Sequence, residues 1–220
     1  MIALLLFGKR PAPGRVKTRL ARVLGAENAA ALAAAFLSDA ARRYGSVPGT
    51  VPVLAADEPD DPFWAATFAP PWRIEAQGAG DLGERLRRAF DRELAAYPKA
   101  AAIGSDHPAL PAADLGRFLA EDNAVWPTLD GGYAAIVLSR PAARARLFEG
   151  IDWSTDRVLP QTLDRARAAG LSLARWTPTA DVDEPADVDR LVRELSARDS
   201  AAPDFPRDTW NALRLLGRAP

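Results

Sequence analysis

The sequence predicts an α/β fold in which helices cover both faces of a mostly parallel sheet. Short apolar runs alternate with helical stretches along the 220 residues, and this alternation is typical of parallel sheets. The first run, Ile2–Phe7, contains no polar residue, as expected for a strand that is buried on both faces. The Gly-, Pro- and charge-rich segments follow predicted strands, so we expect them to meet at one rim of the sheet, where such folds bind ligands.

The predicted strands are short apolar runs bounded by clusters of turn-forming residues. Asp57–Pro62 is predicted as a turn, and Gln77–Gly80 as a loop. The strands are, in chain order, Ile2–Phe7, Val51–Ala55, Trp72–Ala76, Ala100–Gly104, Ala124–Pro127, Tyr133–Leu138 and Leu171–Trp176.

The predicted helices lie between these strands, and one has a clear start signal. Asp81 can cap its helix, and Glu84 stands three residues later, as a capping box requires. Three other helices carry Pro in their first turn, which suits its fixed backbone. The helices are Val16–Leu24, Ala26–Tyr44, Asp81–Tyr97, Pro111–Glu121, Pro141–Phe148, Thr155–Ala169 and Pro185–Ala197.

Composition excludes several classes of protein. A net charge of −1 gives no electrostatic reason to bind nucleic acid or an anionic membrane. The chain has no cysteine, which removes disulfides, thiolate metal sites and cysteine nucleophiles. The opening apolar run is too short for a signal peptide or a membrane span, and no later run is long enough. We therefore expect no membrane span and a cytoplasmic location.

The length suits one main domain with a short tail. We expect the domain over residues 1–197, and a linker with an amphipathic tail over residues 198–220. In the tail, Trp210, Leu213 and Leu216 share one helical face. We expect this face to pack on the domain, with a lid or an oligomer contact as the alternatives. The oligomeric state stays open.

The loop after the first strand predicts a phosphate site. Six cations precede the first acidic residue: Lys9, Arg10, Arg15, Lys17, Arg19 and Arg22. Gly8 and Gly14 let backbone N–H groups approach an anion, and the next helix points its positive end at it. The spacing is neither that of a Walker A loop nor that of GxGxxG. The alternative is a solvated basic helix start.

Two acidic segments are candidate ligands for a divalent cation. Asp106 stands just beyond a predicted strand, and hard cations such as Mg²⁺ or Mn²⁺ prefer oxygen ligands. Asp183 is the second candidate ligand, with Asp181 as its alternative. The alternative for Asp106 is a turn before Pro108. The alternative for the segment that contains Asp183 is that its acidic residues offset the dipole of the next helix. His107, the one histidine, is expected to pack within its turn.

Asp130-Gly131-Gly132-Tyr133 is a third candidate site. Paired glycines allow a ligand to approach the backbone closely. Asp130 can bind sugar hydroxyls or act as a general base, and Tyr133 can stack on a ring or simply pack. The alternative is a hairpin turn, because Asp-Gly is a strong hairpin signal.

In their order along the chain these motifs resemble the DUF2064 family. That family is described as rSAM/selenodomain-associated transferase 1 or as arsenosugar-biosynthesis-type glycosyltransferases, and it belongs with the nucleotide-diphospho-sugar transferases of GT-A fold. The resemblance extends to about Leu195. The motifs that carry it are Lys9–Leu20, Asp81–Arg85, Gly104–Leu110, Asp130–Tyr133, Ile151–Thr155 and Asp181–Pro185.

The resemblance implies a Rossmann-like GT-A domain with a nucleotide at the first loop and a divalent metal at Asp106. It implies phosphate contacts from Gly8, Lys9, Pro13, Gly14, Lys17 and Arg19, and places Gln77, Gly80 and Asp81 near the base. Beside these, the candidate acceptor or sugar site is Asp130, Gly131, Gly132 and Tyr133. Many GT-A glycosyltransferases carry Asp-x-Asp after the central strand, whereas this chain has Ser105-Asp106-His107. A second ligand from afar, Asp183, suits the arrangement of the similar molybdenum-cofactor and phospholactate guanylyltransferases.

The sequence therefore leaves three functions open. The first is glycosyl transfer from a nucleotide sugar to a small-molecule acceptor, with Asp130 positioning or deprotonating the acceptor. The second is nucleotidyl transfer, in which Lys17 stabilises the charge on a nucleoside triphosphate and pyrophosphate leaves. The third is a non-catalytic module that binds a nucleotide or a partner.

Overall fold

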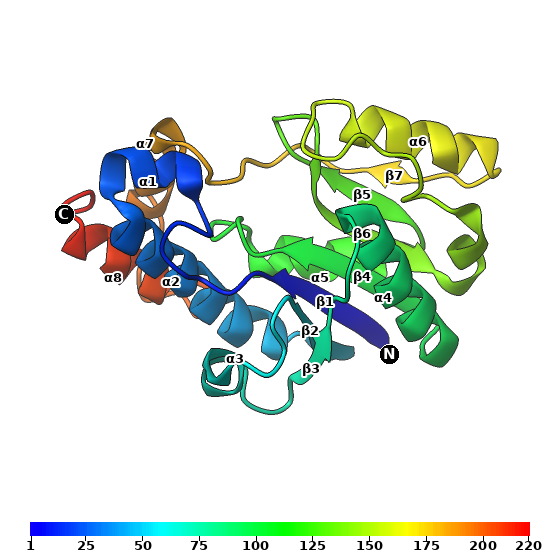
Figure 1. Ribbon diagram of the computed structural model, residues 1–220, viewed down its shortest axis with the longest axis horizontal. Helices are drawn as coiled ribbons and strands as arrows, with labels where there is room; N and C mark the ends of the chain where they lie inside the picture. The colour runs from blue at the N-terminus through cyan, green and yellow to red at the C-terminus, as the bar shows by residue number, and fades with distance from the viewer.

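The computed structural model describes the backbone of residues 1–220 and every side chain except that of Arg144. The chain forms a seven-stranded sheet between layers of helices (Figure 1), which confirms the predicted fold class. The order across the sheet is β3-β2-β1-β4-β6-β5-β7. The strands are β1 (Ile2–Gly8), β2 (Thr50–Ala56), β3 (Arg73–Ala76), β4 (Lys99–Gly104), β5 (Ala124–Pro127), β6 (Tyr133–Ser139) and β7 (Ala174–Arg175).

Six of the seven strands run in the same direction. β1 pairs in parallel with β2 and β4, β2 with β3, and β5 with β7. β6 is antiparallel to both β4 and β5, because the short turn that joins it to β5 can connect only antiparallel strands. The carboxyl ends of the six parallel strands therefore share one rim, and the loops after β1, β3, β4 and β7 leave from it as expected.

The helices cover both faces of the sheet. α2 and α5 pack on one face with α3, and α4, α6 and the 3₁₀ helix η1 lie on the other. They are α1 (Thr18–Leu24), α2 (Ala26–Gly45), α3 (Pro62–Thr67), α4 (Leu82–Ala96), α5 (Ala112–Ala120), η1 (Arg140–Ala145), α6 (Val158–Ala168), α7 (Pro185–Ser196) and α8 (Arg207–Leu215).

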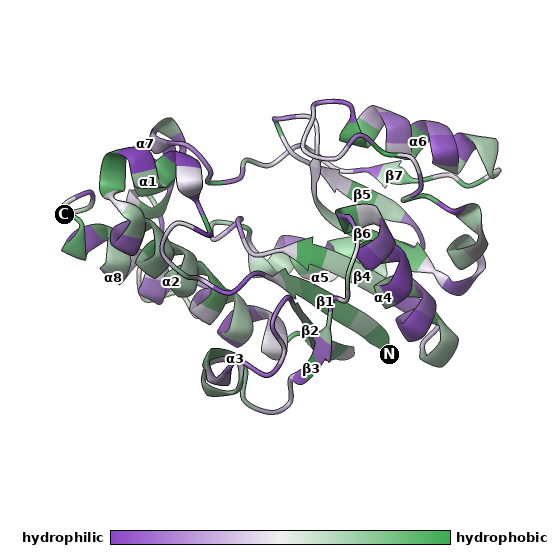
Figure 2. Cartoon of the chain, in the orientation of Figure 1, coloured by the Kyte–Doolittle hydropathy of each residue, from purple (hydrophilic) through white to green (hydrophobic). Residues whose placement is uncertain are grey.

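The central strand β1 explains why the first apolar run has no polar residue. Leu4 and Leu6 point into the core under α2, whereas Ala3 and Leu5 point into the core under α4, because successive side chains alternate across a strand. All four are fully buried. In Figure 2 the central strand β1 is accordingly mostly green, while purple residues lie on the outer sides of α4 and α6.

Three local differences from the predicted elements have simple causes. The segment predicted only as a turn continues into α3, whose first turn is capped by Asp61 (Oδ1 to Phe63 N, 2.8 Å). Residues 140–145 form a 3₁₀ helix where a longer α-helix was predicted. The strand predicted over Leu171–Trp176 is reduced to the two residues of β7 that pair with β5 at the edge of the sheet.

The tail packs on the domain through α8. Leu213 and Phe205 are buried in one cluster with Leu191 and Leu195 of α7. The carboxylate of Asp39 on α2, itself fully buried, accepts hydrogen bonds from the backbone N–H groups of residues 208 and 209 at the start of α8 (3.2 and 2.7 Å). Among the described helices, none combines the length and apolar character that a bilayer crossing needs.

Candidate active site

A cavity of about 250 Å³ opens at the carboxyl ends of β1 and β4. The chain passes from β1 to β2 and β3 on one side and then returns to β4 on the other, so the cavity lies at the topological switch point where α/β sheets bind ligands. Four of the residues predicted for the site line it: Lys9, Lys17, Asp106 and Asp183. The other lining residues are Phe7, Arg15, Val16, Ala33, Leu37 and Ser105.

The side chain of Lys17 lines this cavity and lies near two carboxylates. Its Nζ lies 2.8 Å from Oδ1 of Asp106 and 3.8 Å from Oδ1 of Asp183, and only 6% of the side chain is exposed. The backbone of Lys17 is left-handed (φ 46°, ψ 43°) where it precedes α1. For a residue other than Gly this conformation costs on the order of 1–3 kcal/mol. This backbone conformation places the Lys17 ammonium near the carboxylates of Asp106 and Asp183, which come from distant parts of the chain.

The two acidic segments are fastened to each other through their backbones. The carbonyl of Asp106 accepts a hydrogen bond from the N–H of Val182 (3.1 Å), and Nδ1 of His107 lies 3.2 Å from the carbonyl of Ala180. Desolvation opposes ionisation of Asp106, but the Lys17 ammonium outweighs it and holds the pKa of that carboxyl below its usual value. The site therefore presents ionised Asp106 to a cation.

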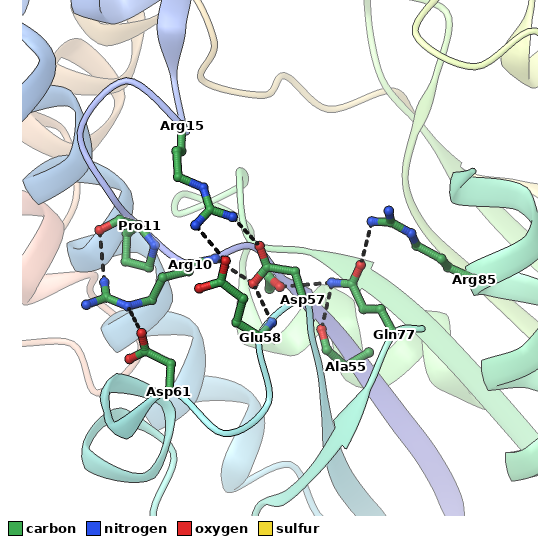
Figure 3. A network of polar contacts seen from close by, with 10 residues as sticks. Arg10, Pro11, Arg15, Ala55, Asp57, Glu58, Asp61, Gln77 and Arg85 are labelled. Atoms are coloured by element: carbon green, nitrogen blue, oxygen red, sulfur yellow. Dashed lines mark hydrogen bonds and ion pairs between the residues drawn. The ribbon is translucent and has the colours of Figure 1, made fainter. Parts of the chain in front are cut away.

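The cations of the first loop divide into two groups. In the first group, Arg10 and Arg15 face the acidic segment that follows β2 (Figure 3), where Nε of Arg10 lies 2.9 Å from Oδ2 of Asp61, and Nη1 of Arg15 lies 2.6 Å from Oε1 of Glu58. Asp57 Oδ1 also accepts the backbone N–H of Arg10 (2.8 Å). These pairs fasten the loop.

The second group of cations is directed to the cavity. Lys17 lies between the acids, and Nη1 of Arg19 lies 3.0 Å from Oδ2 of Asp183. Lys9 lines the cavity and makes no ion pair within the described part of the chain. The counter-charges after β2 were missed at the sequence level. The signal was present, because four acids (Asp57, Glu58, Asp60 and Asp61) stand directly after a strand and therefore at the same rim.

The residues fit a divalent cation that arrives with its phosphate ligand. Asp106 and Asp183 supply oxygen donors, and the ammonium of Lys17 already occupies a cation position between them. Within the residues that the structure describes, no group of three or more His, Cys, Asp or Glu side chains converges. Mg²⁺ is commonly held by one or two carboxylates with substrate phosphates and water, which is what two acids in a cationic cavity can offer.

The loop after β3, with the residues predicted to lie near the base, contributes no residue to the lining of the cavity. Buried Gln77 donates from Nε2 to the carbonyls of Gly8 and Ala55 (both 2.9 Å), and its Oε1 accepts from Nη1 of Arg85 (3.2 Å) (Figure 3). Its side chain is thus committed to the protein, which leaves backbone groups as the part of this residue able to meet a base. The capping box of Asp81 and Glu84 is present as predicted.

Gly8 and Gly14 differ in what they do. A Cβ on Gly8 would lie 3.0 Å from side-chain atoms of Leu54 and Trp64, so a side chain at this position would crowd the core under the loop. Gly14 has a φ of +75° and open space around it, and Pro13 beside it is exposed. Gly14 therefore combines a backbone that favours glycine with room for a ligand.

The Asp130 turn lies on the same rim. Oδ1 of Asp130 accepts from Oγ1 of Thr128 (2.5 Å) and from the N–H of Gly132 (3.1 Å), which fixes the exposed carboxylate. Gly131 has a φ of +90°, and a Cβ there would lie 2.4 Å from the backbone oxygen of Asp156. Together these contacts give the loop after β5 one defined shape.

Two side chains near this turn have different surroundings. Tyr133 packs in the core under α4, and desolvation raises the pKa of its buried hydroxyl, so the structure places its ring in the packing alternative. Asp181 is half-buried, and burial raises the pKa of its carboxyl with a further contribution from the negative charge of Asp130. A pair of acids thus flanks the rim beyond the Lys17 cavity.

Comparison with known proteins identifies the family. A family model described as an uncharacterized protein conserved in bacteria, DUF2064, matches residues 40–155, which is more than half of the 220 residues. The chain belongs to the DUF2064 family. The matched part contains Asp106 and Asp130, whereas Lys17 and Asp183 lie outside it. A search of curated protein sequences finds no match.

Solved structures share the fold of this DUF2064 protein. A candidate nucleotide-diphospho-sugar transferase from Desulfovibrio desulfuricans G20 is 28% identical with a TM-score of 0.85, over 99% of this chain and 96% of that one. A cytidylyltransferase from Leptospira borgpetersenii serovar Hardjo-bovis (10% identity, TM-score 0.57, 98% and 94% covered) is similar in fold alone. So is a CMP:2-keto-3-deoxy-manno-octonic acid synthetase complexed with CTP (13%, 0.54, 89% and 98%).

Proposed function

We propose that this protein is a metal-dependent transferase that moves a glycosyl group from a nucleotide-diphospho-sugar to a hydroxyl of a small-molecule acceptor. The observation that carries the proposal is the ammonium of Lys17 between Asp106 and Asp183, inside a cavity at the switch point of the sheet. This is the charge pattern that a metal-bridged diphosphate requires. The likeness to a candidate nucleotide-diphospho-sugar transferase supports the same class of donor.

The donor side of the site is cationic. Lys9, Lys17 and Arg19 lie around the two acids and can neutralise the oxygens of a diphosphate leaving group. Mg²⁺ or Mn²⁺, when bound with the donor at Asp106 and Asp183, would supply further positive charge to the departing diphosphate. A bound polyphosphate would also be a partner for Lys17. Its ammonium group can therefore pair with the carboxylates before the donor binds and with the phosphates afterwards.

The acceptor side is acidic. Asp130 is held through Oδ1, which leaves Oδ2 to receive a proton from an acceptor hydroxyl. In the proposed reaction the acceptor oxygen bonds to the anomeric carbon of the sugar. The bond from that carbon to the diphosphate oxygen breaks, and the diphosphate keeps the electron pair. The hydroxyl proton passes to Asp130.

Nucleotidyl transfer is the alternative function, and the density of cations in the first loop favours it. Two observations weigh against it. Arg10 and Arg15 are already paired with acids, which leaves fewer cations for a triphosphate than the sequence indicates. Asp130 and Asp181 would repel the phosphorylated acceptor that this reaction needs. An uncharged hydroxyl acceptor suits these acids better.

Product analysis tests the proposal. The protein would be incubated with Mn²⁺ and either nucleotide sugars or nucleoside triphosphates, with a panel of hydroxylated acceptors. Release of nucleoside diphosphate is the expected result. Release of pyrophosphate would instead establish nucleotidyl transfer, and nucleotide-dependent thermal stabilisation without either product would favour a non-catalytic module.

A pair of variants makes this test specific to the site. Asp106→Asn should remove most of the turnover while the protein stays folded. Asp122→Asn is the control, because this carboxylate is 89% exposed and its nearest cation, Lys99, is 4.0 Å away. Full turnover in the Asp106 variant would contradict the proposal.

A further inference from the structure

The one histidine of the chain stands between the two acidic segments of the site. The imidazole of His107 is buried, and its Nδ1 lies 3.2 Å from the carbonyl oxygen of Ala180. Because a carbonyl oxygen only accepts, His107 must carry a proton at Nδ1. Its neighbour Asp106 accepts the N–H of Val182 through its main-chain oxygen (3.1 Å). Residues 106 and 107 thus each make one hydrogen bond to the distant segment, at residues 182 and 180 respectively.

We infer that His107 is a positioning residue, which holds the segment 176–184 against the loop after β4 so that Asp106 and Asp183 face one cation position. We call residues 176–184 the acid strap. The inference rests on the proposed function, because it assigns His107 a purpose in the same metal-diphosphate site. The side chain acts on the site through the strap and touches no substrate.

The acid strap needs such a fastening because it has little regular structure. In Figure 1 it runs as an extended segment from β7 to α7, across the side of the molecule where the rim loops meet. One isolated bridge, Thr179 to Thr128, ties its first part to the loop after β5. At its other end Oδ2 of Asp187 accepts the N–H of Asp183 (3.0 Å). The links from residues 106 and 107 lie between these ends.

The loop after β4 is a firm anchor for the strap. Buried Arg43 on α2 donates to the carbonyls of Pro108 (2.6 Å) and Leu110. Arg198, after α7, donates to the carbonyl of Ala109 (3.1 Å). Three consecutive carbonyls after His107 are therefore held by guanidinium groups. On this fixed loop, the hydrogen bond from His107 to Ala180 holds the strap beside the bond from Val182 to Asp106, while Arg190 of α7 donates to the carbonyl of Asp181 (2.6 Å).

Successive side chains of the strap point to opposite sides, so the position of the strap decides whether the carboxylate of Asp183 reaches the site. Val182 is buried in the cluster with α1, α2 and α7, whereas Asp183, the next residue, reaches the Lys17 ammonium. A shift of the strap along the loop would carry Asp183 away from Asp106. Partners that orient metal ligands are worth about 10–100-fold in metal affinity when they are removed.

Three variants separate positioning from simple packing. His107→Leu removes the N–H donor and keeps an apolar side chain. His107→Asn restores an N–H donor near the place of Nδ1. Thr162→Val is the matched control, because it removes a buried hydrogen bond (Oγ1 to the carbonyl of Val158, 2.8 Å) on α6, away from the strap.

Two measurements are made on the full chain. Hydrogen exchange of peptides that span residues 176–184, without any ligand, reports whether the strap is fastened. Calorimetric titration with Mn²⁺ and inorganic pyrophosphate reports the affinity for a metal-bridged diphosphate and requires no knowledge of the base. We expect His107→Leu to exchange the Val182 amide about tenfold faster and to bind Mn²⁺-pyrophosphate about tenfold more weakly. His107→Asn should recover both, and Thr162→Val should change neither.

The outcomes distinguish this inference from the proposed function. Wild-type exchange and affinity in His107→Leu would overturn the inference. So would a loss that His107→Asn fails to rescue, because that loss would come from packing. If the wild-type protein does not bind Mn²⁺-pyrophosphate, the proposed function fails, and hydrogen exchange alone then decides whether His107 fastens the strap.

Discussion

Lys17 and Asp106 meet at the floor of the cavity, with 2.8 Å between Nζ and Oδ1, although 88 residues and three strands separate them in the chain. The contact depends on a left-handed backbone at Lys17 and on the placement of Asp106 just after β4. An ammonium group in this position protects the carboxylate from protonation and holds it for a cation. The pair therefore links the first loop, which offers charge to phosphates, to the loop that offers oxygens to a metal.

Replacing Lys17 tests the role of this ammonium group. Lys17→Met should lower turnover by about 100-fold or more, which is the usual cost of losing one group that stabilises transition-state charge. The pKa of Asp106 should rise, because burial then acts on the carboxyl without the opposing charge of the Lys17 ammonium. Nucleoside diphosphate release measures the first effect. Arg22→Met is the control, since Arg22 is an exposed cation on α1, the helix that Lys17 precedes. Equal losses in both variants would mean that net charge matters and position does not.

The sheet and its rim were predictable because they follow from local patterns. Apolar runs mark strands that are buried on both faces, and chain alternation makes most of them parallel. That argument brought the loops after residues 7, 104 and 176 to one edge, where the structure has Lys17, Asp106 and Asp183 together. The antiparallel direction of β6 was not part of the prediction, although the Asp-Gly turn before it signals a hairpin.

The partners of each charge were not predictable, because they depend on contacts across the fold. Six cations in the first loop look equivalent in the sequence, but Arg10 and Arg15 are used by acids that follow β2. His107 looks like a turn residue until the strap at Ala180 lies against it. Tyr133 could stack on a ring or pack when judged from the sequence alone, and the structure packs its side chain against the core. These contacts form between residues that are far apart in the sequence, so the local sequence pattern does not predict them.

Removing the carboxylate of Asp39 should weaken the attachment of α8. This buried side chain accepts the first N–H groups of α8 and pairs with Arg42. Asp39→Ala should therefore lower the free energy of unfolding by about 2 kcal/mol, from a lost cap and from buried donors left unpaired. Urea unfolding measures the change, and limited proteolysis between residues 198 and 206 reports release of the helix. Asp164→Ala, at an exposed pair on α6, should leave both readouts unchanged.

The ionised carboxylate of Asp181 should lower the free energy of unfolding at neutral pH. Burial and the charge of Asp130 raise the pKa of its carboxyl in the folded state above the value in the unfolded chain. The stabilising contribution of such a group is complete below the unfolded pKa and is lost as pH rises through the folded pKa. Asp181→Asn should therefore raise the melting temperature at pH 7 and lose this advantage near pH 4. Asp189→Asn, on the exposed side of α7, is the control. A pH-independent gain would show that the carboxylate charge is not the cause.

Gly131 should be the least replaceable glycine of the rim. Gly131 and Gly170 both have positive φ (+90° and +69°), so alanine is strained at either position. At Gly170 the added methyl group would meet open space, whereas at Gly131 it would lie 2.4 Å from the backbone oxygen of Asp156. Gly170→Ala should cost about 1 kcal/mol. Gly131→Ala should cost more, and it should also lower turnover, because the turn that fixes Asp130 must move. Thermal unfolding and product release measure the two effects. Equal destabilisation with normal turnover in both variants would show that the loop after β5 yields without disturbing Asp130, and the carboxylate would then lose its assigned place beside the acceptor.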